Sequence, residues 1–105
     1  MSEYDYAWEN LHVAVDSFAG EGSEREQLLN ALVSALDRIF PNRDLPPEIR
    51  EDFEQMIKVV TKFRTVGPIG GYEKNLEILS DKAVSKAISE IKRFYDVVCS
   101  YKDPI

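Results

Sequence analysis

The sequence predicts an all-α protein, specifically an antiparallel up-down-up-down four-helix bundle that forms a single domain over residues 1–105. Apolar residues recur every three or four positions in four separate segments, which is the period of a helix with one buried face. No segment shows the alternation of apolar and polar residues that is typical of a β-strand. The connections between segments are short, which favours antiparallel neighbours.

The first helix is expected over residues 4–18. Its apolar stripe advances in steps of 4, 3, 4 and 3 and consists of Tyr4, Trp8, Leu11, Val15 and Phe18. Gly20 and Gly22 follow directly, and glycine commonly lies just past the last apolar residue of a helix. We therefore expect the helix to end before these glycines.

The second helix is expected over residues 23–40. Ser23 and Glu26 have the spacing of a capping box, in which each side chain bonds the backbone amide of the other residue. The apolar stripe that follows contains Leu29, Leu32, Leu36 and Ile39, and it is widened by Leu28, Val33, Ala35 and Phe40. Pro41 should end this helix, because proline disfavours the helical conformation of the residue before it.

A connector is expected over residues 42–47, and its prolines should start the third helix. That helix is expected to run to Arg64, with Lys62 and Arg64 in its last turn. Its apolar stripe consists of Ile49, Phe53, Met56, Val60 and Phe63. The glycine-rich residues 66–71 should break it.

The last segment, residues 72–101, is expected to be helical but divided. A single helix of this length would measure ~45 Å, whereas the other three would measure ~24–28 Å. Ser80-Asp81 is the expected break, because both residue types favour the start of a helix. We therefore expect a short helix over residues 72–79 and a long one from residue 81.

Composition and charge exclude several classes of protein. The formal net charge of −6 disfavours binding to nucleic acids and anionic membranes, both of which require a basic surface. No apolar run reaches the ~18 residues that span a bilayer, and the acidic start is unlike a signal peptide. The single cysteine, Cys99, allows no internal disulfide. We expect a cytoplasmic protein with neither nucleic-acid nor membrane partners.

Little in the sequence indicates catalysis, and no cofactor is expected. Glu9 and His12 have the Glu-x-x-His spacing of di-iron bundles, but such a site needs a second histidine, and His12 is the only one. The residues after His12 do not resemble a phosphotransfer helix, and residues 67–71 lack the Gly-Lys-Ser/Thr ending of a phosphate loop. We expect a protein that is not an enzyme. The alternative from the enzyme class is metal-assisted chemistry on the first helix, at Asp5, Glu9 and His12.

The net charge is concentrated in the first quarter of the chain. Residues 1–26 contain 7 acidic residues and 1 basic residue, whereas acids and bases cancel over residues 27–105. On the first helix, acidic residues share one face with His12, and tyrosine and tryptophan lie beside them. Tyr and Trp are common interface hot spots, and an acidic field attracts a basic partner. The predicted partner-binding residues are Tyr4, Asp5, Tyr6, Trp8, Glu9, His12 and Asp16.

These observations favour a non-catalytic protein-binding module with a basic protein partner. In size, acidity and expected architecture, the chain resembles small bacterial immunity and antitoxin proteins, and this resemblance implies that the partner is a basic toxin. The alternative is a structural or regulatory homo-oligomer, such as a homodimer. In that case aromatic residues would pack across a two-fold axis, and the candidates are Tyr4, Trp8, Tyr72 and Tyr101.

Overall fold

The computed structural model describes residues 4–60 and 76–101, and within these ranges the regular structure is entirely helical, without a strand. The elements are α1 (Asp5–Ser17), α2 (Glu24–Ser34), the 3-10 helix η1 (Leu36–Arg38), α3 (Pro41–Asp44), α4 (Pro47–Val60) and α6 (Asp81–Cys99). Residues 76–78 are helical as well. The prediction of an all-α protein is therefore confirmed.

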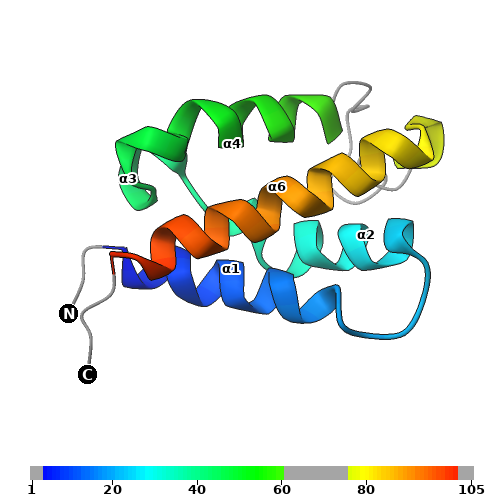
Figure 1. Ribbon diagram of the computed structural model, residues 1–105, viewed down its shortest axis with the longest axis horizontal. Helices are drawn as coiled ribbons and strands as arrows, with labels where there is room; N and C mark the ends of the chain where they lie inside the picture. Colours follow the sequence, from blue (N-terminus) through cyan, green and yellow to red (C-terminus); the bar gives the residue numbers. More distant parts are fainter. Residues whose placement is uncertain (1–3, 61–75, 102–105) are drawn as a thin grey trace.

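Helix α6 lies between the other long helices, with α4 on one side and α1 and α2 on the other (Figure 1). α1 runs antiparallel to α6, because Trp8 contacts Cys99 and, one turn later, His12 contacts Tyr95. α1 also packs closely against α2, whereas α4 packs on α3 and α6. The finer prediction, an up-down-up-down four-helix bundle, stays a prediction.

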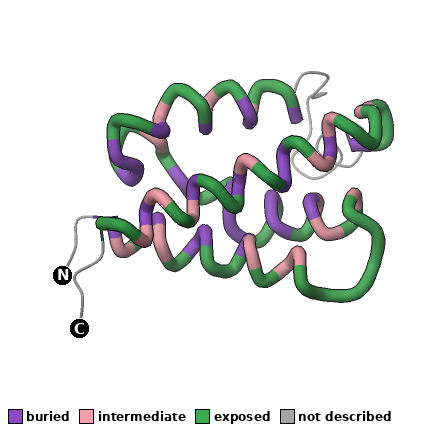
Figure 2. Tube along the Cα trace, in the orientation of Figure 1, coloured by how far each residue is buried: buried purple, intermediate pink, exposed green. Residues whose placement is uncertain are grey.

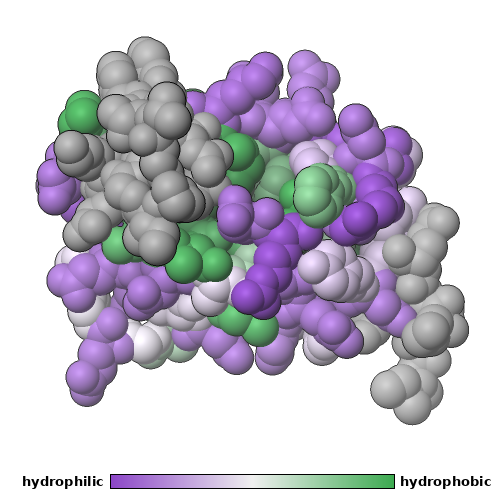
Figure 3. Space-filling view, turned by 180° about the vertical axis from the view of Figure 1, so that it is seen from behind, coloured by the Kyte–Doolittle hydropathy of each residue, from purple (hydrophilic) through white to green (hydrophobic). Residues whose placement is uncertain are grey.

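The buried apolar residues form one core cluster between these helices, and they lie mainly on the inward sides of the helices (Figure 2). Phe53 of α4 and Phe94 of α6 are its largest fully buried side chains, with ring centroids 5.8 Å apart. Seen from behind, the surface is mostly hydrophilic, and hydrophobic side chains are exposed in separate patches (Figure 3). The core therefore holds α4 against α6 through a pair of aromatic rings.

The first predicted helix is present, but its buried face is rotated from the predicted stripe. Ala7, Leu11 and Ala14 are fully buried, whereas Trp8, Val15 and Phe18 are half-buried around the core. Alanine side chains are small and allow the backbones of packed helices to approach closely. The larger side chains of the stripe consequently lie at the edges of the contact.

The prediction of one continuous helix over residues 23–40 is wrong. α2 ends at Ser34, Ala35 leaves the helical conformation, and η1 follows. Phe40 is extended, as the residue before a proline prefers to be, but Pro41 begins α3 rather than ending a helix. Val33 and Phe40, which were expected to widen the buried stripe, are 54% and 58% exposed.

The predicted helix starts are confirmed. The Ser23 side chain accepts a hydrogen bond from the Glu26 amide, Pro47 begins α4, and the Ser80 side chain accepts one from the Ala83 amide at the start of α6. The chain is thus divided at Ser80-Asp81, as predicted. The expected end of the third helix near Arg64, the glycine-rich break and residues 72–75 lie outside the described residues. In the described part of the chain, no helix combines the length and apolar character that crossing a bilayer requires.

Candidate functional site

The acidic residues of α1 lie on its outer face, away from Ala7, Leu11 and Ala14. Glu9, His12 and Asp16 are exposed, and Asp5 is half-buried. Asp5 and Glu9 form no ion pair with any residue in the described ranges, while the Asp16 carboxylate lies 3.6 Å from His12 Nε2. We name Asp5, Glu9, His12 and Asp16 the acidic surface.

The arginines that form ion pairs in the described part of the chain do so with acidic residues outside α1. These pairs are Arg25–Asp81 at 2.7 Å between α2 and α6, Arg93–Asp52 at 2.7 Å between α4 and α6, Arg93–Glu90 at 3.3 Å within α6, and Arg43–Asp44 at 2.8 Å within α3. Their positive charges are therefore balanced elsewhere. The charge of the acidic surface faces solvent, where it can act on a partner.

Trp8 and His12 connect α1 to α6. Their rings are stacked, with centroids 5.1 Å apart. The Trp8 indole Nε1 donates to Cys99 Sγ at 3.3 Å, and His12 Nδ1 is hydrogen bonded to the Tyr95 hydroxyl at 3.0 Å. Burial, followed by the hydrogen bond with Cys99, raises the pKa of Tyr95. The single tryptophan, histidine and cysteine thus belong to one contact between two helices.

Tyr4 is buried, and its ring meets that of Tyr101 edge-on at 5.2 Å between centroids. The Tyr101 hydroxyl donates to the Glu48 carboxylate. Three of the four aromatic residues proposed to pack across a two-fold axis, Tyr4, Trp8 and Tyr101, therefore pack within the chain. Tyr72 lies outside the described residues.

Tyr6 lies on a different edge of α1 from Trp8 and is 45% exposed. The Arg43 guanidinium lies 5.9 Å from the centroid of the Tyr6 ring and 4.6 Å from that of Phe40. We name Tyr6, Phe40 and Arg43 the aromatic platform. Sequence reasoning found Tyr6 but missed the other two, although Pro41 is a signal that Phe40 does not continue the helix before it.

Asp44 fixes the position of Arg43. Its carboxylate accepts hydrogen bonds from Arg43 Nε at 2.8 Å and from the Phe40 amide at 2.8 Å. Burial acts to raise the pKa of Asp44, but these hydrogen bonds outweigh it and leave the pKa below its usual range. The carboxylate is therefore ionised near neutral pH and orders α3.

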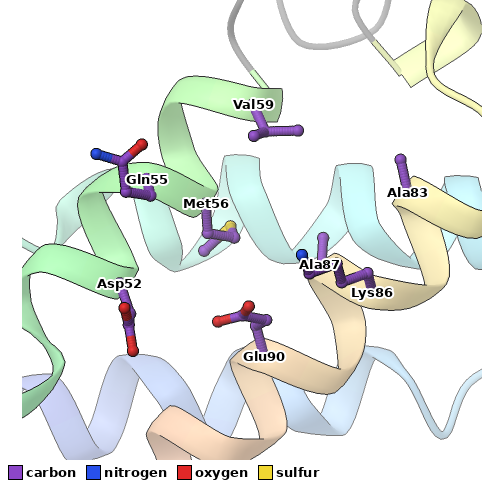
Figure 4. A pocket seen from close by; sticks show the side chains of 8 residues that line it. All are labelled: Asp52, Gln55, Met56, Val59, Ala83, Lys86, Ala87 and Glu90. Atoms are coloured by element: carbon purple, nitrogen blue, oxygen red, sulfur yellow. The ribbon is translucent and has the colours of Figure 1, made fainter.

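A groove of about 300 Å³ lies between α4 and α6. Its lining includes the apolar side chains of Met56, Val59, Ala83 and Ala87, as well as the polar ones of Asp52, Gln55, Lys86 and Glu90 (Figure 4). Arg93 binds both Asp52 and Glu90. The two carboxylates of this groove thus share an ion-pair partner, unlike Asp5 and Glu9 of the acidic surface.

The metal alternative is not supported by the geometry. Among residues 4–60 and 76–101, no three His, Cys, Asp or Glu side chains are grouped in a way that could hold a metal ion. Asp5, Glu9 and His12 all lie in these ranges. They share a helix face without converging on one point.

Comparison with known proteins matches the chain to no protein-family model, no curated protein and no solved structure.

Proposed function

We propose that the protein is a non-catalytic binding module whose acidic surface on α1 binds a basic protein. The observation that carries this proposal is that Asp5 and Glu9 have no ion-pair partner among the described residues. Unbalanced surface carboxylates attract a cationic partner over a distance of about one Debye length, ~8 Å at physiological salt. The net charge of −6 adds a favourable long-range field.

The contacts of His12 and Cys99 support the proposal that the protein is not catalytic. These are the two side chains best suited to proton transfer or nucleophilic attack near neutral pH. His12 is stacked on Trp8 and bonded to Tyr95, and Cys99 Sγ accepts from Trp8. Both side chains stabilise the contact between α1 and α6, which keeps the acidic surface in place.

The architecture belongs to the same proposal. We propose that α1, α2, α4 and α6 form the antiparallel up-down-up-down bundle, which presents one side of α1 to solvent. The support is the direction of α1 and α4, since both run antiparallel to α6. Along α1, Trp8 lies by Cys99 and His12 by Tyr95. Along α4, Glu48 lies by Tyr101 and Asp52 by Arg93. The resemblance to small bacterial immunity proteins suggests one class of basic partner, a toxin.

An affinity pull-down from the source organism tests the acidic surface. The bait proteins are the wild type and the charge-reversal variant Asp5→Lys/Glu9→Lys. We expect the wild type to retain a basic protein, identified by mass spectrometry, and the variant to lose it, because attraction becomes repulsion at two of the three carboxylates of the surface. Raising the salt concentration should weaken the wild-type interaction as well.

A matched control distinguishes the effect of the acidic surface from the effect of net charge alone. Glu51 and Glu77 are exposed and lie outside α1, so Glu51→Lys/Glu77→Lys changes the net charge by the same amount at other places. This control should retain the partner. The proposal fails if all three baits recover the same basic proteins equally well.

A further inference from the structure

We infer that the partner bound by the acidic surface also places apolar side chains on the aromatic platform of Tyr6, Phe40 and Arg43. The partner segment is therefore both basic and apolar rather than uniformly cationic. This inference rests on the proposed function and extends it, because it specifies the chemistry of the bound segment. The apolar part of the proposed interface is therefore the platform and not Trp8, which the sequence predicted as a binding residue.

The rings of the platform are exposed. Phe40 is 58% exposed and Tyr6 is 45% exposed, whereas the Tyr4 ring is buried and the Trp8 ring is stacked on His12 beside α6. Val13, also 45% exposed, lies two turns after Tyr6 on the same edge of α1. Burial of aromatic rings is a main source of binding energy in protein interfaces.

Contacts within the chain already order the platform. The Arg43 guanidinium contacts both rings, and its position is fixed by the buried Asp44 carboxylate. Asp44 also accepts from the Phe40 amide, which fixes the backbone that carries the second ring. A pre-ordered surface loses less conformational entropy when it binds a partner.

The charges around the rings are complementary to a basic partner segment. Tyr6 and Glu9 are three residues apart on α1 and are therefore neighbours on its surface, so the Glu9 carboxylate lies beside the Tyr6 side of the platform. The Arg43 guanidinium forms an ion pair with Asp44. The basic partner therefore does not meet an unpaired positive charge at the platform. A lysine or arginine of the partner can then meet Glu9 while an apolar neighbour covers Phe40.

Two synthetic peptides of equal length and charge test the inference, one built from lysine and leucine and one from lysine and serine. Fluorescence anisotropy measures the affinity of each labelled peptide for the protein. The wild type should bind the lysine–leucine peptide about tenfold more tightly, because its apolar side chains bury the exposed rings of the platform. Tyr6→Ala/Phe40→Ala should remove this preference and leave the affinity for the lysine–serine peptide unchanged.

Two control variants test whether the preference for the lysine–leucine peptide depends on the platform. Val59→Ala, an exposed apolar truncation in the groove between α4 and α6, should keep the tenfold preference. Asp5→Lys/Glu9→Lys should weaken the binding of both peptides. If the platform variant keeps the preference, or Val59→Ala loses it, the inference is overturned although the acidic surface can still bind. If charge reversal leaves the lysine–serine peptide bound as before, the proposed function itself fails.

Light scattering distinguishes a partner segment from a second copy of the chain. We expect the wild type and Tyr6→Ala/Phe40→Ala to have the same molar mass over a wide concentration range. A wild-type dimer that becomes a monomer in the platform variant would show that the rings bind another copy, and it would overturn the inference. Circular dichroism checks that the platform variant stays folded.

Discussion

Asp44 is one of two polar residues that are buried in the described part of the chain, the other being Asn10. A buried carboxylate is stable only when hydrogen bonds replace its lost hydration. Asp44 meets this requirement locally, through Arg43 and the Phe40 amide. A single residue thereby orders α3, positions Arg43 and fixes the backbone of Phe40, whose exposed ring contacts the Arg43 guanidinium.

Replacing Asp44 with alanine should lower the free energy of unfolding by about 1–2 kcal/mol near neutral pH, because the Phe40 amide loses its acceptor. The pKa of Asp44 is lower in the folded chain than in the unfolded chain, so its contribution is complete above about pH 4 and is lost as the pH falls through the folded pKa. Urea unfolding of both proteins between about pH 7 and pH 2.5 measures the difference.

The difference in unfolding free energy between wild type and Asp44→Ala should therefore decrease as the pH falls. Glu51→Ala, an exposed acidic residue of α4, serves as the control and should change the unfolding free energy by less than about 0.5 kcal/mol. A destabilisation by Asp44→Ala that is independent of pH would contradict the role given to its charge.

Some helix boundaries are set by the chemistry of nearby residues, and others are set by tertiary packing. Ser23, Pro47 and Ser80 start helices as their residue types predict, since caps and prolines act on neighbouring backbone groups. The end of α2 at Ser34 has no such local signal. Leu36 and Ile39 are both buried after the helix ends, so the chain leaves the helical path while still contributing to the core.

The start of α6 depends on the Ser80 cap. Ser80→Ala should lower the free energy of unfolding by about 1 kcal/mol, because the Ala83 amide loses the hydrogen bond that it donates to the Ser80 side chain. Ser89→Ala is the matched control, since Ser89 is exposed within α6 and alanine is the better helix former. Thermal unfolding followed by circular dichroism compares the two variants. Equal effects of both substitutions would show that Ser80 is not an important cap.

For the molecule as a whole, stability depends on the aromatic contact that joins α4 to α6. Phe94 is fully buried against Phe53, with the two ring centroids 5.8 Å apart. The other contacts between α4 and α6 include the ion pair of Asp52 with Arg93, which is largely exposed and therefore contributes little. Loss of the aromatic contact should consequently affect the entire fold.

Phe94→Ala should lower the free energy of unfolding by about 3–5 kcal/mol, because it leaves a cavity in the core. Phe40→Ala removes the same ring from an exposed site and should cost less than about 1 kcal/mol. Urea unfolding measures both variants under the same conditions. Similar losses for the two variants would contradict the assignment of Phe94 to the core and of Phe40 to the surface.

The candidate site was predictable only in part. Asp5, Glu9, His12 and Asp16 share a helix face because their spacing and the helical period determine it. The position of the aromatic residues could not be predicted in this way. Tyr4 and Trp8 pack against residues of α6 and the C-terminal turn, which are about ninety positions away in the chain, and no local pattern reports such a contact.

The sequence by itself determined the helical class, three helix starts and the concentration of acidic charge on one helix face, since each depends on residues that are close together in the chain. Tertiary packing decided which side of α1 is buried, where α2 ends, and that Trp8 is part of the α1–α6 contact while Phe40 is exposed. The physical reason is that burial is set by neighbours brought together from distant segments. A local period of three or four residues cannot encode those neighbours.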